Sequence, residues 1–295
     1  MAYYHPLKGW PDCTDLKGAL PLLAKGKFRD VYTLSPDTLL VVATDRIFAY
    51  DVTMKNGIPN KGKFLTARSE FWLTTVLKDV GPNHFKFSAQ LKGRSMVVKK
   101  LNVFPVEAIV RGYLTGSAWV EYQDYGTVHG IQVPQGMEEC QAFEKPLFTP
   151  STKAAQGQHD ENIHPDKVAQ LVGHEYAKKI EEFSLALYTK ARDYAAGRGI
   201  IIADTKFEFG LDKDKNVVLV DGVLTPGSSR FWLASACKAG RSQDSYDKQS
   251  LRDWLTKYKL KGRHGVVLPD KVILEMGNKY HEAYELLARR EWKEV

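Results

Sequence analysis

Alternating apolar and polar residues predict a β-hairpin within residues 199–232. The run 200–202 consists of isoleucines, which is typical of a buried strand. The alternation that follows places three charged side chains on one face of this strand: Asp204, Lys206 and Glu208. The polar run 212–216 forms the turn, and the apolar run 217–223 returns as the second strand.

The register of this hairpin decides which side chains face each other. A loop over residues 213–216 pairs Glu208 with Asp221, so two carboxylates lie opposite each other. Like charges in that position repel, and we expect a cation or a shared proton between them. Mg²⁺ is the natural candidate, because it binds one or two carboxylates and leaves its other positions to water and phosphate oxygens. The alternative is that Lys206 neutralises Glu208 at a solvated edge, and the spacing alone favours neither.

The N-terminal third is predicted to be a mostly antiparallel sheet covered by one helix. Patterns typical of β-strands occur at residues 27–34, 38–44, 95–101 and 106–113. Between the second and third of these strands, residues 65–77 have the apolar spacing of a helix.

The next segment, residues 126–165, is predicted to be rich in loops, since it contains four prolines and a long polar run. Long ordered loops of this kind usually serve a site. Pro165 suits the first position of one long helix, which follows a 3.6-residue period and stops at Gly197. Two further helices are predicted over residues 246–258 and 271–290.

Length and composition indicate a globular protein with two subdomains. The chain has 295 residues, of which 43% are hydrophobic, enough for a sizeable core. Its formal charge of +7 suggests anionic partners, but the charges of both signs are interleaved, so phosphorylated small molecules fit better than nucleic acid. The three cysteines are far apart and predict neither a disulfide framework nor a metal site. Without a basic leader or an apolar run of ~20 residues, we expect a cytoplasmic protein with no membrane partner.

Two basic motifs fit phosphate binding. In KGKFRDVY, Lys27 and Arg29 are two positions apart on a predicted strand and point the same way. In VRGYLTGSAW, Arg111, Thr115 and Ser117 precede a helix and offer a guanidinium and hydroxyls to one phosphate, together with backbone N–H groups. The alternatives are a solvated pair of cations in the first motif and a capped helix start after an edge strand in the second.

Seven segments, in order along nearly the whole chain, resemble one enzyme family. They are GKFRDVY, DRIFAYD, VEAIVRGYLTGSAW, FTPSTKAAQGQHDEN, IIADTKFEFG, TPGSSRFW and SQDSYDKQ. Together they resemble the phosphoribosylaminoimidazole-succinocarboxamide synthase (SAICAR synthase) family of purine biosynthesis, in its fungal-type form.

The resemblance implies an α+β fold in which an N-terminal antiparallel sheet binds ATP, as in protein kinases and ATP-grasp enzymes. We expect this β-rich part at residues 1–105 and a larger α+β part, with the metal and substrate site, at residues 106–295. The implied reaction is amide ligation. ATP phosphorylates the carboxylate of carboxyaminoimidazole ribonucleotide, and the amine of aspartate then displaces the phosphate. A monomer or a small homo-oligomer is expected.

The resemblance also implies roles for individual residues. ATP contacts are expected from Lys27, Arg29, Glu107, Glu208 and Asp221, the last two of which also hold Mg²⁺. Substrate contacts are expected from Phe48, Asp51, Arg111, Ser117, Gly222, Gly227 and Arg230. At the centre of the reaction we expect Lys206, Lys153 and Asp204. A loop that keeps water away from the acyl phosphate is expected to contain His159 and Asp160.

Three positions depart from the family pattern. Phe48 stands where the family has serine, Gly222 where it has glutamate, and Gly227 where it has aspartate. These changes remove two carboxylates and a hydroxyl from the substrate end of the site, and a bound hydroxyl that loses a charged partner forfeits about 1.5–3 kcal/mol. Two explanations stay open. One is drift that neighbouring residues compensate, and the other is a paralogue recruited to specialised metabolism, which joins a less polar carboxylic acid to an amino acid.

SAICAR-type ligation is therefore the first hypothesis, and the recruited ligase is its alternative. A nucleic-acid-binding protein would need a clustered basic face with stacking aromatic residues, which the sequence does not offer. A catalytically inactive relative would not need the four charged residues Lys27, Arg29, Glu208 and Asp221.

Overall fold

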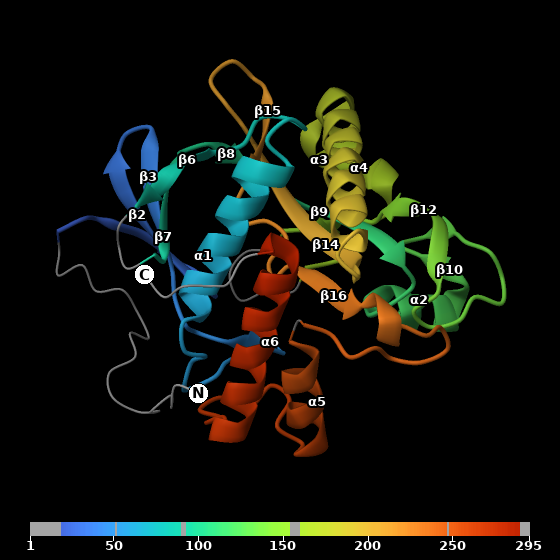
Figure 1. Ribbon diagram of the computed structural model, residues 1–295. Helices are drawn as coiled ribbons and strands as arrows, with labels where there is room; N and C mark the ends of the chain where they lie inside the picture. Colours follow the sequence, from blue (N-terminus) through green and yellow to red (C-terminus); the bar gives the residue numbers. More distant parts are fainter. Residues whose placement is uncertain (1–18, 51, 90–92, 154–159, 247, 290–295) are drawn as a thin grey trace. The chain divides into compact units, whose positions relative to one another are not determined.

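The computed structural model describes residues 19–50, 52–89, 93–153, 160–246 and 248–289 (Figure 1). The chain forms two compact units, and each is considered by itself. Unit 1 comprises Met1–Glu70, Phe85–Lys100 and Tyr246–Val295, and unit 2 comprises Phe71–His84 and Leu101–Ser245. The division of the sequence into parts at residues 1–105 and 106–295 is a different partition and stays a prediction.

Unit 1 contains the antiparallel sheet predicted for the N-terminal third, but the predicted strand at residues 106–113 is not part of it and belongs to the sheet of unit 2. The strands of the unit 1 sheet follow the order β1 (Leu22–Lys25), β2 (Arg29–Ser35), β3 (Thr38–Ala43), β7 (Ser95–Lys99) and β6 (Phe85–Ala89), and every pair is antiparallel. One expectation is wrong: Lys27 does not share a strand with Arg29. The N–H of Gly26 donates to the carbonyl of Arg29 over 2.7 Å, and this tight turn places Lys27 in the bend before β2.

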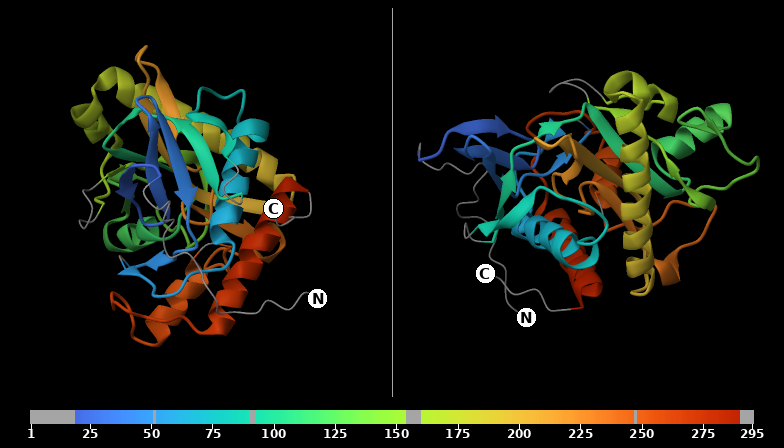
Figure 2. Two further views of the ribbon diagram at one scale, coloured as in Figure 1. Left: turned by 90° about the vertical axis from the view of Figure 1, so that its left-hand side faces the viewer. Right: turned by 90° about the horizontal axis from the view of Figure 1, so that it is seen from above.

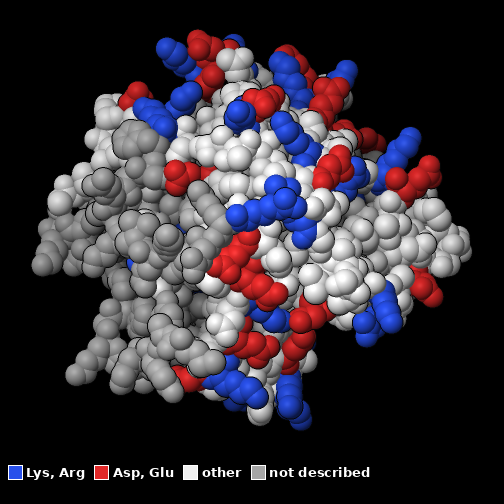
Figure 3. All heavy atoms as spheres, viewed as in Figure 1, with Lys and Arg blue, Asp and Glu red and all other residues white. Residues whose placement is uncertain are grey.

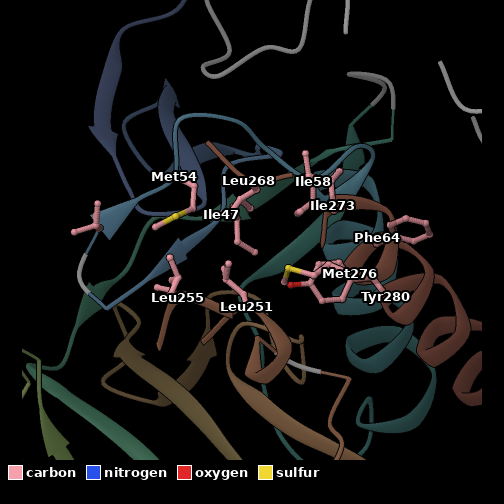
Figure 4. Close-up of a cluster of buried hydrophobic side chains, with 12 residues drawn as sticks. Ile47, Met54, Ile58, Phe64, Leu251, Leu255, Leu268, Ile273, Met276 and Tyr280 are labelled. Atoms are coloured by element: carbon pink, nitrogen blue, oxygen red, sulfur yellow. The ribbon is translucent and has the colours of Figure 1, made fainter. Parts of the chain in front are cut away.

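The main hydrophobic cluster of unit 1 joins segments from both ends of the sequence (Figure 4). Ile47 and Val52 come from the short hairpin region of β4 (Phe48–Ala49) and β5 (Val52–Thr53), and Phe64 comes from α1 (Lys61–Phe71). The C-terminal helices add the remaining helical side chains: α5 (Gln249–Lys257) contributes Leu251 and Leu255, and α6 (Asp270–Ala288) contributes Ile273, Met276 and Tyr280. Burial of these apolar faces explains why the chain's last helices belong to the first unit.

The first helix differs from its prediction over residues 65–77. It begins at Lys61, directly after Asn60, whose left-handed φ of 60° ends the preceding turn. After Phe71 the chain continues as a π-helix over Trp72–Val76, in which Trp72 and Leu73 are buried. The apolar spacing therefore predicted that this segment is helical and partly buried, but it did not predict the first and last residues of the helix.

Unit 2 contains an antiparallel sheet whose strands differ in length and are arranged around one long strand. β14 (Ile200–Leu211) pairs with β9 (Val106–Tyr113), β15 (Val217–Val220), β16 (Ser229–Leu233) and β8 (Asn102–Val103). β9 also pairs with β12 (Ala142–Phe148) and β13 (Ser151–Thr152). The alternative of a capped helix start after an edge strand is therefore wrong about the strand, because β9 lies between β12 and β14.

The segment predicted as loops, residues 126–165, contains several strands. Besides β12 and β13 it forms the small hairpin of β10 (Thr127–Val128) and β11 (Ile131–Gln132). Pro146, one of the four prolines of this segment, lies within β12 although proline has no N–H to donate to a neighbouring strand. The pairing of β12 with β9 shifts register between Ala142 and Leu147, and this irregularity accommodates the proline.

The hairpin of β14 and β15 forms as predicted, but its register is shifted by one residue. Glu208 lies opposite Val220, and Leu211 lies opposite Val217. The loop takes all five residues of the polar run, because the Asp212 carboxylate accepts hydrogen bonds from the N–H groups of Asp214 and Asn216 at 2.9 and 2.8 Å. The expected pairing of Glu208 with Asp221 across the strands is therefore wrong, and Asp221 follows the end of β15.

The long helix predicted from Pro165 is interrupted. A 3-10 turn (Pro165–Lys167) and α3 (Val168–Val172) come first, Gly173 adopts a left-handed φ of 85°, and α4 (His174–Ala196) then ends before Gly197 as expected. α4 runs alongside β14 (Figure 2), where the Tyr188 hydroxyl donates to the carbonyl of Ile202 at 2.7 Å. The remaining helices of this unit are α2 (Ser117–Tyr125) and a 3-10 turn (Ala234–Ala236). The α+β class is confirmed, and no helix in the described ranges has the length and apolar character to span a membrane.

Candidate functional site

One group of charged side chains in unit 2 lies across three neighbouring strands. Asp204 of β14 pairs in register with Arg111 of β9 on one side and with Arg230 of β16 on the other. Its Oδ2 accepts a hydrogen bond from Arg111 Nη1 at 2.9 Å and another from Arg230 Nη1. The carboxylate therefore holds two guanidinium groups together, and we call Arg111, Asp204 and Arg230 the guanidinium group.

Arg111 is fixed by further contacts with Thr149, which follows β12, and with Ser117 at the start of α2. Its Nε donates to Thr149 Oγ1 at 3.1 Å, and its Nη2 donates to Ser117 Oγ at 3.2 Å. Burial lowers the pKa of Arg111, and the Asp204 charge opposes this effect. The predicted association of Arg111 with Ser117 is present, whereas the support from Thr149 had no signal in the motif. The result is a pair of cations beside a hydroxyl at a helix start, a set of donors that suits a phosphate.

Gly116 is required where this turn meets the guanidinium group. Its φ of 63° is in the left-handed region, and a Cβ at this position would lie 2.4 Å from Arg230 Nη2. Only glycine fits both conditions without displacing Arg230.

A second group lies on the same face of β14, where Lys206 and Glu208 follow Asp204 by two and four residues. We call these two residues and their partners, Glu107 and Lys153, the second group. Lys206 Nζ donates to Glu107 Oε2 of β9, and Lys153, which follows β13, donates to Glu208 Oε2. Ser151 of β13 donates to Glu107 at 3.3 Å. The alternative in which Lys206 neutralises Glu208 is therefore wrong, because Lys206 contacts Glu107 and the lysine that contacts Glu208 is Lys153. Lys153 takes that place because β13 pairs with β9 and brings it close.

The carboxylates of this second group interact electrostatically. Burial and then the charge of Asp221 raise the pKa of Glu208, and Lys153 opposes them. The expected repulsion between Glu208 and Asp221 is thus present although the two residues are not paired in the sheet. Among the described residues, no three His, Cys, Asp or Glu side chains gather as a metal-binding cluster. Two carboxylates that need a cation still suit Mg²⁺, which takes its other ligands from phosphate and water.

Other predicted site residues lie in unit 1. Lys27 is exposed, and its ammonium lies 4.7 Å from the centroid of the Phe48 ring. Arg29 is half-buried at the start of β2. Asp51 lies outside the described residues, as does His159 of the predicted loop in unit 2.

The remaining predicted residues belong to unit 2. Asp160 is exposed, Gly222 is buried directly after Asp221, and Gly227 is exposed in the turn before β16. Their predicted roles, like those of the residues in both charged groups, stay predictions.

Comparison with known proteins identifies the family of this chain. The sequence model of SAICAR synthetase matches residues 22–267. The phosphoribosylaminoimidazole-succinocarboxamide synthase of Pichia angusta is 55% identical over 298 residues, covering 95% of this chain and 98% of that protein. The protein of the same name from Saccharomyces cerevisiae is 52% identical over 300 residues, covering 95% of this chain and 98% of that protein. The solved structure of SAICAR-synthase from Saccharomyces cerevisiae complexed with SAICAR is similar with a TM-score of 0.88 at 50% identity, covering 95% of this chain and 99% of that chain. The chain therefore belongs to the SAICAR synthetase family.

Proposed function

We propose that this protein catalyses the SAICAR synthase reaction, in which the carboxylate of carboxyaminoimidazole ribonucleotide is joined to the amine of aspartate. Membership of the family makes the chain an ATP-dependent ligase that forms a carbon–nitrogen bond. The observation that carries the specific proposal is the arrangement of both charged groups on one face of β14. Asp204, Lys206 and Glu208 succeed each other at intervals of about 7 Å along this strand. A substrate with a phosphate at one end and a carboxylate at the other can contact both groups.

The guanidinium group is proposed to bind the phosphate of the ribonucleotide. Arg111 and Arg230 supply the charge, and Ser117 supplies a hydroxyl next to Arg111. Asp204 orients both guanidinium groups and offsets part of their charge before substrate arrives. Its role in this proposal is therefore positioning, in place of the direct role in the reaction that the motif suggested.

The second group is proposed to act where phosphoryl transfer takes place. Glu208 and Asp221 would hold Mg²⁺, which supplies positive charge to the nucleotide phosphates and to the oxygens between which phosphoryl moves. Lys206 and Lys153 carry ammonium groups beside the same carboxylates and neutralise the charge that develops on the substrate carboxylate. Glu107 holds Lys206 in place until a more highly charged partner binds.

The ATP contacts named from the resemblance stay part of this proposal: Lys27 and Arg29 bind phosphates, and Glu107 also contacts the nucleotide. The predicted loop with His159 and Asp160 excludes water, so that the acyl phosphate is consumed by the amine. Aspartate is the amine donor, as the name of the reaction product requires.

The alternative of a recruited ligase is not favoured by the comparisons. Identities of 52–55% to proteins named as SAICAR synthases extend over 95% of this chain. Phe48, Gly222 and Gly227 are then changes within the same function. The prediction of a monomer or small homo-oligomer in the cytoplasm stays a prediction.

Charge distribution bears on the nucleic-acid hypothesis. Figure 3 shows Lys and Arg interspersed with Asp and Glu over the described part of one face. Binding to arbitrary DNA or RNA that weakens steeply with salt would support that hypothesis against ours.

Incubation of the purified protein with ATP, Mg²⁺, aspartate and carboxyaminoimidazole ribonucleotide tests the proposed reaction. We expect SAICAR and ADP in equal amounts. Hydrolysis of ATP without SAICAR, or turnover only with another carboxylic acid, would refute it. Arg230→Met serves as a variant in the same assay and should raise the KM for the ribonucleotide.

A further inference from the structure

One short stretch of unit 2, residues 149–153, contacts both charged groups of the candidate site. Thr149 Oγ1 accepts a hydrogen bond from Arg111 Nε at 3.1 Å, in the guanidinium group. Ser151 and Lys153 donate to carboxylates of the second group, Ser151 at 3.3 Å. We call residues 149–153 the bridging segment. A displacement of its backbone would therefore change the contacts of both groups at once.

The middle of the bridging segment is held by a histidine ring. His129 Nδ1 lies 2.9 Å from the carbonyl oxygen of Pro150, and the ring donates its N–H because a carbonyl can only accept. The N–H of Ile163 donates to the same oxygen at 3.0 Å. His129 is 3% exposed and Pro150 is also buried. Bulk water therefore does not replace the ring as a donor, and loss of the ring leaves this carbonyl with one partner fewer.

His129 occupies an unusual place for a buried side chain, the tip of a two-residue hairpin loop. Val128 of β10 pairs with Ile131 of β11, so the loop consists of His129 and Gly130, with φ values of 51° and 77°. Positive φ at both loop residues is typical of a type I′ turn, in which asparagine is favoured at the first position. Backbone geometry alone therefore favours asparagine, and the contact with Pro150 gives a reason for the buried imidazole.

The same hairpin is attached to the helix that begins at the guanidinium group. Glu121 of α2 accepts hydrogen bonds from the N–H of Gly130 and from Thr127 Oγ1, both at 2.9 Å. α2 begins at Ser117, whose hydroxyl belongs to the proposed phosphate site. The hairpin therefore connects the start of α2 with the bridging segment, through Glu121 on one side and His129 on the other.

We propose that His129 is a positioning residue for the ligation, which holds the bridging segment so that Thr149 and Lys153 reach their partners in the two charged groups. This inference rests on the proposed function, which assigns the phosphate of the ribonucleotide to one group and phosphoryl transfer to the other. Burial, and then the charge of Arg111, lowers the pKa of His129 to about 4, so the ring is neutral at neutral pH. A neutral ring donates to Pro150 without adding charge beside Arg111.

Replacement of His129 by asparagine and by leucine tests the inference, with His174→Leu as the matched control. Asparagine has an amide N–H at the position of Nδ1 and tolerates a left-handed φ, whereas leucine has no donor. His129→Asn should keep kcat and the KM for the ribonucleotide within about threefold of the wild type. His129→Leu should lower kcat and raise this KM, each about tenfold or more.

The control separates this effect from the loss of any histidine. His174 lies in the same unit and is exposed at the start of α4, so His174→Leu should change neither kinetic constant. Equal kinetic constants in His129→Asn and His129→Leu would overturn the inference, because only the former keeps the donor.

A double-mutant cycle separates positioning from a purely structural role. Thr149→Val removes the hydroxyl that accepts from Arg111, and this residue lies in the bridging segment. If His129 acts through that segment, the losses in kcat/KM should not multiply, and Thr149→Val combined with His129→Leu should lie within about threefold of the worse single variant. Losses that multiply would overturn the inference. Should His129→Leu not fold, His129→Gln takes its place in the cycle, because its amide N–H lies one carbon beyond the position of Nδ1.

Inorganic phosphate provides a measurement that does not depend on ligation. Phosphate should raise the melting temperatures of the wild type and His129→Asn, and it should raise that of His129→Leu less, because Thr149 then no longer fixes Arg111. A wild type that forms SAICAR, with the same kinetics and phosphate response in both variants, refutes the inference and leaves the proposed function intact. A wild type that forms no SAICAR, together with the expected difference in phosphate response, refutes the function and supports the positioning role of His129.

Discussion

Replacing Asp204 by asparagine should expose how much the guanidinium group depends on its central carboxylate. Asp204 is 5% exposed and accepts hydrogen bonds from two arginines on neighbouring strands. Asparagine keeps the shape and one carbonyl acceptor but removes the charge. Arg111, itself 4% exposed, is then left with a buried charge that has lost its counterion.

The expected loss of unfolding free energy follows from these exposures. Removing one partner of a buried ion pair costs about 3–5 kcal/mol. The Arg230 side chain is 23% exposed, so water screens part of its share. The carbonyl oxygen of the introduced asparagine can still accept one hydrogen bond. We therefore expect a loss near the lower end of that range, about 3 kcal/mol.

Urea unfolding at neutral pH measures this loss, with Asp193→Asn as the control. Asp193 lies in the same unit and pairs with Arg192 on the surface, so its replacement should cost less than about 1 kcal/mol. Inorganic phosphate should stabilise Asp204→Asn more than the wild type, because it returns negative charge to the two guanidinium groups. Equal losses in both variants, or no additional effect of phosphate, would refute the reasoning.

Three further predictions concern neighbouring features. Gly116→Ala should lower the free energy of unfolding by about 1–2 kcal/mol, measured in urea, because alanine is strained in the left-handed conformation of this position. It should also raise the KM for the ribonucleotide, because the added Cβ displaces Arg230. Burial, and then the charge of Arg111, lowers the pKa of His129 to about 4 from 6.5. Below pH 6.5 the unfolded chain therefore binds a proton at His129 that the folded chain does not bind. The free energy of unfolding should fall between pH 6.5 and 4 by up to about 3 kcal/mol more in the wild type than in His129→Asn, as measured by urea unfolding at each pH. Chelation of divalent cations should abolish ligation, and Glu208→Gln should raise the Mg²⁺ concentration needed for half-maximal rate at least about tenfold, as measured in a magnesium titration.

Strand positions were predictable wherever alternation coincided with burial. β9 spans the predicted residues 106–113, and in β14 Phe207 and Phe209 are each 1% exposed while Lys206 and Glu208 are only half-buried. The hairpin register was not predictable from that alternation alone. It depends on the Asp212 side chain, which holds the loop at five residues.

The charged face of β14 could also be predicted, but the partners of its residues could not. Period-two spacing places Lys206 and Glu208 together whatever the sheet order. Their actual partners, Glu107 and Lys153, reach them through the pairing of β9 with β14 and β13. Such neighbours depend on sheet topology, for which a local pattern gives no evidence.

Asp221 shows how the shifted register bears on the proposed chemistry. In the expected register its backbone would have been a regular part of the strand, with its carboxylate fixed opposite Glu208. Instead Asp221 follows the last residue of β15 and adopts a φ of 62°, a left-handed conformation that costs a residue with a Cβ about 1–2 kcal/mol. Its charge nevertheless raises the pKa of Glu208. A strained residue that also brings two carboxylates into repulsion lowers stability twice, and binding of a cation by both carboxylates gives a reason for that arrangement.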